Sequence, residues 1–132
     1  LLDLFSIDEE EREILGENFS FFMLPHGPGK TMGFIHGKFA YLIDCHVIPK
    51  KLIERLRGLE LDVLLIDCVR REAHQTHLNV EKAFFYIEKI APKRAGLIHM
   101  AHQLDHEDLL GEAENFFDFS VFPVYDGQQL YY

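Results

Sequence analysis

Four short apolar runs in this sequence are each followed by a histidine or an aspartate. The runs cover residues 19–24, 39–43, 62–66 and 95–98, and the side chains that follow them are His26, Asp44 with His46, Asp67, and His99. An apolar run of this length predicts a buried strand. In open α/β sheets the C-terminal ends of neighbouring strands converge on one crevice. The sequence therefore predicts a mixed α/β fold with imidazole and carboxylate side chains gathered at one rim of the sheet.

The remaining segments predict helices and turns between these strands. A capping box from Ser6 to Glu9 predicts a short helix that ends near Gly16. Apolar residues at helical spacing predict one helix after Pro49 and another that is capped by Asn79. The other expected elements are a turn at residues 25–29, a hairpin joining strands 32–36 and 39–43, strands 62–67 and 94–98, a loop over 69–76, a short helix over 104–110 that stops before Gly111, and strands 117–124 and 128–132 around a turn at 125–127.

Composition limits the kind of protein that the chain can be. With 132 residues, 48% of them hydrophobic, residues 1–132 suit one compact domain. The formal net charge of -9 disfavours nucleic acid as a partner. No apolar run approaches the roughly 20 residues that span a bilayer, and no signal peptide is visible, so we expect a cytoplasmic protein without a membrane partner. Cys45 and Cys68 form no CxxC pattern, so the sequence predicts neither a thiolate zinc site nor a disulfide framework.

Several of these polar residues have the chemistry of metal ligands. Neutral imidazole and carboxylate suit Zn²⁺, Mn²⁺ or Fe²⁺, which favours a metal role for His26, Asp44 and His99. A histidine exposed in a glycine-rich turn and an aspartate that caps a turn are the competing interpretations for His26 and Asp44. For His102 and the Asp105-His106 pair, the competing interpretation is a solvated helix start.

Four short motifs, taken together, resemble the later motifs of metallo-β-lactamase-fold hydrolases. They are Pro25-His26-Gly27, Tyr41-Leu42-Ile43-Asp44, His77-Leu78 and Ile98-His99. The branch they are most similar to contains the cyclic-ribose phosphodiesterase of phosphonate breakdown and the tRNA 3′-processing endonucleases. The resemblance runs from about residue 19 to residue 130. It implies a site with two divalent cations, Zn or Mn.

The resemblance also implies a role for individual residues. His26, Asp44 and His99 match metal ligands, His77 matches the proton donor beside the substrate phosphate, and we assign substrate binding to His102. Ile98 stands where the family usually has threonine. The implied reaction is hydrolysis of a small phosphodiester by a metal-activated hydroxide. An ester or thioester hydrolase of the same fold, or a non-catalytic protein-interaction domain, is the alternative.

One signature of the family does not occur in this sequence. The segment His-x-His-x-Asp-His, which supplies most ligands of the first cation, is absent, and residues 102–106 do not replace it. The family fold is an αββα sandwich of two similar halves, so the resemblance predicts that the chain is the second half. It could be a fragment of a complete hydrolase, or a partner-dependent or degenerate relative. We expect it to be inactive alone and to pair with the missing N-terminal half or with itself.

Overall fold

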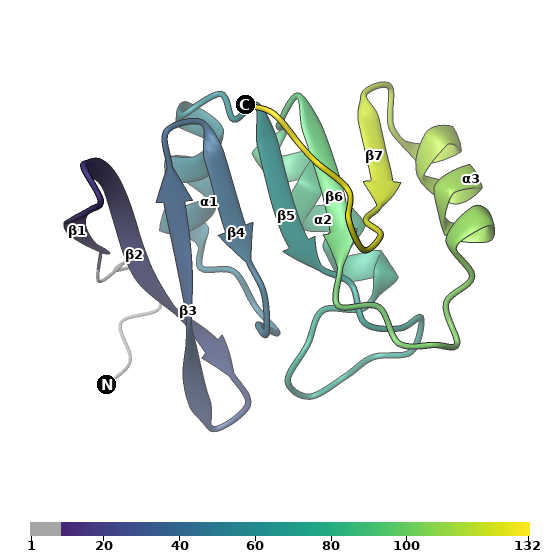
Figure 1. Cartoon of the computed structure of the whole chain (residues 1–132). Coiled ribbons are helices and arrows are strands. Elements are labelled where there is room, and N and C mark those ends of the chain that lie inside the picture. The colour runs from purple at the N-terminus through teal and green to yellow at the C-terminus, as the bar shows by residue number, and fades with distance from the viewer. Residues whose placement is uncertain (1–8) are drawn as a thin grey trace.

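The structure is a computed structural model that describes residues 9–132, and it contains a single seven-stranded mixed sheet (Figure 1). The strand order is β1-β2-β3-β4-β5-β6-β7, so every strand lies beside its neighbour in the chain. The strands are β1 (Glu9–Ile14), β2 (Glu17–His26), β3 (Gly29–His36), β4 (Phe39–Leu42), β5 (Val63–Asp67), β6 (Arg94–Ile98) and β7 (Ser120–Pro123). The helices are α1 (Lys50–Gly58), α2 (Val80–Ile90) and α3 (His106–Phe116).

The type of strand pairing changes once across the sheet, from antiparallel to parallel. Strands β1 to β4 form antiparallel pairs, whereas β4 to β7 form parallel pairs. The parallel strands all end at the same edge, because parallel neighbours run in the same direction. The segments that follow β4, β5 and β6 therefore emerge together, and they carry the polar residues of the predicted site.

One face of the sheet is covered by α1 and α2, which lie behind the strands in Figure 1. Each helix buries an apolar stripe, with Leu52 and Leu56 in α1 and Phe84 and Ile87 in α2. These side chains pack with sheet residues of the same face into one core. Helix α3 packs beside β7 and buries its own two core residues, Leu109 and Ala113. The core thus fixes the strands whose ends carry the site.

The opposite face of the sheet carries a row of half-buried aromatic side chains that none of the helices within residues 9–132 covers. We call this set the aromatic face; it comprises Phe19, Phe21, Phe34, Phe39 and Tyr41, whose neighbouring rings have centroids 5.2–6.2 Å apart. In the register of the sheet, Phe34 on β3 lies directly opposite Phe21 on β2 and directly opposite Tyr41 on β4. Aromatic cross-strand pairs of this kind stabilise a sheet.

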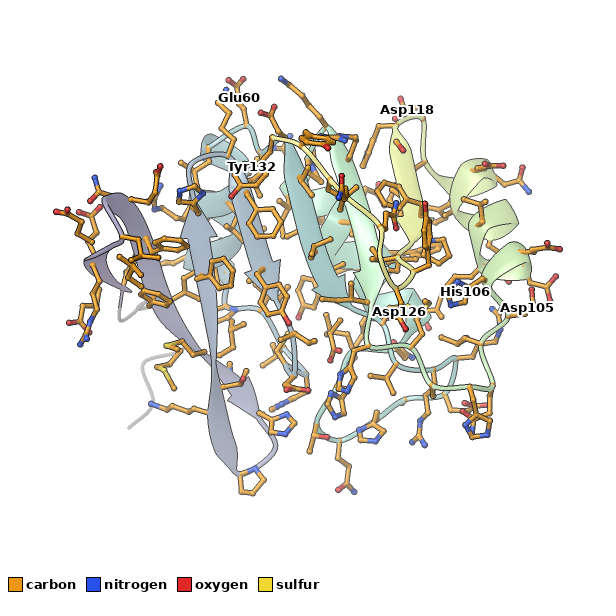
Figure 2. The ribbon with its side chains drawn as sticks, viewed as in Figure 1. Glu60, Asp105, His106, Asp118, Asp126 and Tyr132 are labelled. Atoms are coloured by element: carbon orange, nitrogen blue, oxygen red, sulfur yellow. The ribbon has the colours of Figure 1, made fainter. Side chains whose placement is uncertain are left out.

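The C-terminal tail, residues 124–132, crosses in front of the parallel strands and ends over this face (Figures 1 and 2). The ring of Tyr132 stacks on Phe39 with centroids 4.9 Å apart, and its hydroxyl is hydrogen-bonded to His36 Nδ1 at 2.6 Å. The Arg94 guanidinium donates to the carbonyl of Tyr131. The tail therefore covers only part of the aromatic face.

Most elements predicted from the sequence are confirmed. The strands expected near residues 19–24, 32–36, 39–43, 62–67 and 94–98, the turn at residues 37–38 and the helices after Pro49 and Asn79 are all present. The Asn79 side chain accepts a hydrogen bond from the backbone of Lys82 at 3.0 Å, as an N-cap does. The fold class, α/β with a mixed sheet and flanking helices, is also confirmed.

The predicted N-terminal helix is wrong. Glu9–Ile14 is strand β1, which pairs antiparallel with β2 from Glu9 opposite Phe22 to Ile14 opposite Glu17; the expected cap Ser6 lies outside the described residues. Each residue of this exposed segment lies opposite a residue of the long strand β2, and the resulting antiparallel pairing outweighs a weak local helix preference. The glycine at position 16, with φ +83°, closes a hairpin here and does not end a helix.

Three other boundaries differ from the prediction. Strand β2 continues to His26 and pairs with Gly29, because Gly27, with φ +55°, allows a two-residue turn. Helix α3 continues through Gly111, since Leu109 and Ala113 carry its apolar stripe past a glycine that costs only about 1 kcal/mol. Residues 128–132 form no strand in the described part of the chain, because the turn at Gly127 sends them across the sheet face, away from a free strand edge.

Candidate metal centre

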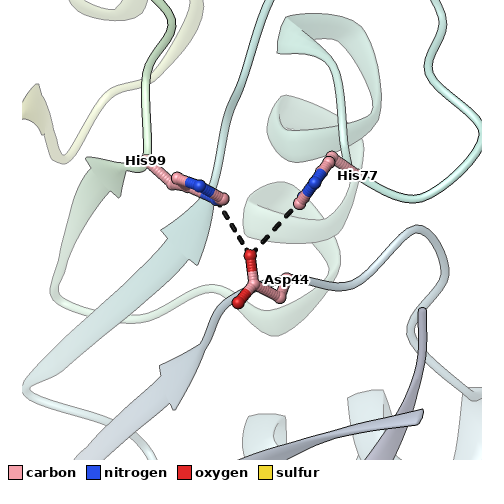
Figure 3. A group of neighbouring side chains, drawn as sticks. All are labelled: Asp44, His77 and His99. Carbon is pink, nitrogen blue, oxygen red and sulfur yellow. Dashed lines mark ion pairs between the residues drawn. The ribbon is translucent and has the colours of Figure 1, made fainter. Parts of the chain in front are cut away.

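Three polar side chains from separate loops face one another at the edge where the parallel strands end (Figure 3). Asp44 follows β4, His99 follows β6, and His77 lies in the loop between β5 and α2. The Nδ1 atom of His99 lies 3.1 Å from Asp44 Oδ1, and the Nδ1 atom of His77 lies 3.8 Å from the same oxygen. One ligand atom from each of the three residues lies within 4.8 Å of the others. Two imidazoles and one carboxylate fit a divalent cation in ligand type and in spacing.

The backbone at this edge is held in an uncommon conformation at two of these residues. Asp44 has φ +56° and His99 has φ +62°. A residue other than glycine in this left-handed region costs of the order of 1 kcal/mol or more, and such residues gather at functional sites. In both cases the turn comes directly after a parallel strand. It directs the two side chains toward one another across the strand ends.

Asp67, the last residue of β5, is hydrogen-bonded to two of the histidines, His77 and His99. Its side chain is fully buried, with His77 Nδ1 2.9 Å from Oδ2 and His99 Nδ1 3.0 Å from Oδ1. Burial raises the pKa of Asp67 above its ordinary value, and the hydrogen bonds from the two imidazoles oppose that rise. The sequence pattern marks Asp67 as a residue at a strand end and predicts no role for it. The signal that could have found this role was the same strand-end position that marked Asp44.

His26 lies beside His77 and outside the group of three. Its ring centroid is 5.0 Å from that of His77, and the two rings meet edge to face. The Nδ1 atom of His26 lies 3.1 Å from the backbone carbonyl of Thr76. The structure thus brings His26, Asp44, His77 and His99 to one rim of the sheet. His102 is exposed in the loop before α3 and is not a member of the group of three.

Hydrogen-bond partners divide the histidines of this region into two kinds. The Nδ1 atoms of His26, His77 and His99 face a carbonyl or a carboxylate, which only accept hydrogen bonds. Each of these rings therefore carries its proton on Nδ1 and keeps the Nε2 lone pair free. His46 and His74 are the reverse, because their Nδ1 atoms accept from the backbone N–H groups of Gly27 and Thr76, both at 3.1 Å. His46 and His74 brace the loops, whereas the first three have a nitrogen free for a ligand.

The helix start near the site is a structural feature of α3. Asp105 is the N-cap of α3 and accepts from the backbone N–H of Asp108 at 3.0 Å, and His106 follows it in the first turn. Figure 2 shows both at the lower end of α3. The interpretation of this pair as a solvated helix start is confirmed.

Comparison with known proteins supports this description of the fold. The family model of the beta-lactamase superfamily domain matches residues 2–100 of the chain. No curated protein matches the chain. Within residues 9–132, no helix has the length and apolar character needed to cross a membrane.

Solved structures with the same fold include the following three proteins. A diphosphatase from the PhnP family superposes with a TM-score of 0.80 at 31% identity, over 92% of this chain and 45% of that protein. The metallo-beta-lactamase fold protein YhfI from Bacillus subtilis superposes with a TM-score of 0.72 at 19% identity, over 90% and 51%. An isothiocyanate hydrolase from Delia radicum gut bacteria has a TM-score of 0.65 at 13% identity, over 92% and 57%.

The chain spans about half the length of these three proteins. The fold and the family model agree over most of the chain, and the polar cluster lies where the parallel strands end. The chain therefore belongs to the beta-lactamase superfamily domain family and has the metallo-β-lactamase fold.

Proposed function

We propose that the full-length protein containing this chain is a metal-dependent hydrolase of phosphodiesters. The observation that carries the proposal is the convergence of Asp44, His77 and His99 at the ends of β4 to β6, with His26 beside them. Four residues from four separate loops meet there, and their atoms are of the types that bind divalent cations. A surface loop that had only a structural role would not need this arrangement.

In this proposal His26, Asp44 and His99 bind the cations. The rings of His26 and His99 each keep a free Nε2 lone pair, and Asp44 contributes a carboxylate oxygen. Two cations, Zn²⁺ or Mn²⁺, would lower the pKa of a water molecule and neutralise charge on a phosphoryl group. The second cation needs ligands from outside this chain, because His-x-His-x-Asp-His does not occur in it.

His77 has the surroundings of a general acid. Its Nδ1–H donates to the buried carboxylate of Asp67 at 2.9 Å, which stabilises the protonated ring. Only 15% of the His77 side chain is exposed, so the ring is held in place beside Asp67 and Asp44. We propose that His77 takes up a second proton on Nε2 and transfers that proton to the leaving oxygen of the substrate, while its Nδ1–H stays hydrogen-bonded to Asp67. A positioned acid of this kind contributes about 10²- to 10⁴-fold to the rate.

The substrate is proposed as a small phosphodiester, and His102 as a residue that contacts it. His102 is exposed in the loop that begins just after His99, so its ring can approach a ligand from the open side of the cluster. A phosphoanhydride is a second candidate, because the structure with 31% identity to this chain is that of a diphosphatase. Both substrates present a phosphoryl group and an oxygen leaving group, which the same residues would serve.

We also propose that the N-terminal half of the full-length protein covers the aromatic face. The face exposes apolar rings that the C-terminal tail covers only in part. Leaving apolar surface in water is unfavourable by about 25 cal/mol per Å². A location in the cytoplasm completes the proposal, and the two buried free cysteines, Cys45 and Cys68, are consistent with a reducing compartment.

The test is a substrate comparison on the purified full-length protein loaded with Zn²⁺ or Mn²⁺. We expect hydrolysis of bis(p-nitrophenyl) phosphate and little hydrolysis of p-nitrophenyl acetate or of a thioester. Faster turnover of an inorganic or nucleoside diphosphate would assign the phosphoanhydride. Turnover of the acetate or thioester alone would reject the phosphodiesterase, and the absence of any turnover would favour the interaction domain.

A further inference from the structure

We propose that Asp67 is a positioning residue that sets the proton of both His77 and His99 on Nδ1, and so presents both Nε2 atoms to the metal and the substrate. The inference extends the proposed function, because it explains how the proposed ligand and the proposed acid are held. It rests first on two hydrogen bonds of one buried carboxylate. Asp67 Oδ2 lies 2.9 Å from His77 Nδ1, and Asp67 Oδ1 lies 3.0 Å from His99 Nδ1.

The backbone around Asp67 holds the same two loops. The N–H of Cys68 donates to the carbonyl of Ile98 at 3.0 Å, directly before His99. The N–H of Val69 donates to the carbonyl of Leu78 at 3.0 Å, directly after His77. The end of β5 therefore fixes both the peptide chain and the ring of each histidine. These backbone hydrogen bonds keep the Asp67 carboxylate within hydrogen-bonding distance of both rings.

A buried carboxylate is the group that this geometry requires. A neutral imidazole has two tautomers, and its surroundings decide between them. An ionised carboxylate has only acceptors, so two N–H donors can face its two oxygens at once. An amide has one acceptor and one donor group, and it can satisfy only one of two rings that both carry Nδ1–H. The fully buried side chain leaves no room for water to compensate.

Asp44 does not duplicate this role. Its Oδ1 lies 3.1 Å from His99 Nδ1, so both carboxylates approach the same ring nitrogen. The Asp44 side chain is 42% exposed, whereas that of Asp67 is fully buried. When the Asp44 oxygen binds a metal ion, the Nδ1–H of His99 can still donate its hydrogen bond to Asp67. Asp67 thus leaves Asp44 free to be a ligand.

The tautomers can be observed directly. In the metal-free full-length protein with ¹⁵N-labelled histidine, long-range ¹H–¹⁵N spectra distinguish a protonated Nδ1 from a protonated Nε2. We expect Nδ1–H for both His77 and His99 in the wild-type protein. In Asp67→Asn we expect one of the two rings to move its proton to Nε2, because the amide N–H must face a lone pair. Zn²⁺ affinity should fall by about 10- to 100-fold.

Asp62→Asn is the matched control, since Asp62 lies just before the same strand and pairs on the surface with Lys93 Nζ at 2.9 Å. It should leave both tautomers and the Zn²⁺ affinity unchanged. A neutral His77 or His99 ring with its single proton on Nε2 in the wild-type protein would overturn the inference even if Asp67→Asn fails to fold. Unchanged tautomers in a folded Asp67→Asn would do the same. An inactive wild-type protein with the expected tautomers would instead reject the proposed function alone.

Discussion

The rings of His26 and His77 lie edge to face with their centroids 5.0 Å apart, although one comes from the β2–β3 hairpin and the other from the loop before α2. This contact places a proposed metal ligand next to the proposed acid. A substrate oxygen held at the cations would therefore lie near a proton donor. The relationship makes the role of His77 testable separately from metal binding.

We expect His77→Ala in the full-length enzyme to lower kcat by about 10²- to 10⁴-fold while the metal content stays nearly unchanged. The reason is that the variant removes the acid and leaves His26, Asp44 and His99 in place. Steady-state kinetics and metal analysis of the same sample measure the two effects. His106→Ala, an exposed histidine in the first turn of α3, is the control and should match the wild type. A loss of bound metal in His77→Ala would assign His77 to the metal ligands.

Metal binding should stabilise the full-length protein. A ligand at 100 times its Kd stabilises the folded state by about 2.7 kcal/mol, so Zn²⁺ or Mn²⁺ should raise the Tm, and a chelator should reverse the rise. Asp44→Asn should remove most of the shift, because it replaces a carboxylate of the group of three. Asp118→Asn, an exposed aspartate between α3 and β7, should keep it. Equal shifts in the two variants would contradict the assignment of Asp44.

Two glycines in this fold should respond to alanine in opposite ways. A Cβ at Gly33 would lie 2.5 Å from the Phe22 ring and 2.9 Å from the backbone oxygen of Tyr41, which cannot move without breaking the sheet. Overpacking of this kind lowers the free energy of unfolding by about 1–3 kcal/mol. A Cβ at Gly111 meets no atom within 4 Å, and the position is helical. Gly111→Ala should therefore raise the free energy of unfolding by about 0.5–1 kcal/mol. Urea unfolding measures both variants, and a stabilised Gly33→Ala or a destabilised Gly111→Ala would contradict the prediction.

The isolated chain should associate through the aromatic face. Size-exclusion chromatography with light scattering should detect dimers or larger species at micromolar concentration. Phe21→Lys, which places a charge among the rings of Phe19 and Phe34, should shift the chain toward monomer. Phe85→Lys is the control, because Phe85 is an exposed ring on the outer side of α2. A wild-type chain that is monomeric, binds two metals and hydrolyses bis(p-nitrophenyl) phosphate would refute the proposal that the other half is required.

The elements that could be predicted from sequence are those whose signal is local. The stripe of α2 and its cap Asn79 lie within one short segment, so helical periodicity identifies this helix. Strand β5 is covered on both sides, and its short uninterrupted apolar run identifies it. Strand β1 could not be predicted in this way. Its residues Glu9–Ile14 are exposed and carry little pattern, and only the partner strand β2 makes them a strand.

The candidate site divides in the same way. The strand-end positions of Asp44 and His99 predict that they meet, because the rule about parallel strands applies to any such pair. The contact of Asp67 with two rings could not be predicted, since it depends on the distance between loops that are far apart in the chain. Tautomers are also beyond sequence, because the partner of each Nδ1 decides them. The sequence therefore does not predict that His46 accepts a hydrogen bond at Nδ1 whereas His26 donates one from Nδ1.

The order of the sheet also bears on how the chain can fold. Each strand from β2 to β7 pairs with the strand that precedes it, and none of the described strands is inserted between two earlier ones. During synthesis the sheet can therefore grow at one edge as each new strand leaves the ribosome, because domains begin to fold from the N-terminal side. The hairpins β1–β2 and β2–β3 involve short loop closures and can form first, whereas β5 and β6 must await the crossover helices α1 and α2. Asp44, Asp67, His77 and His99 would then come together only at the last parallel additions, when most of the sheet already exists.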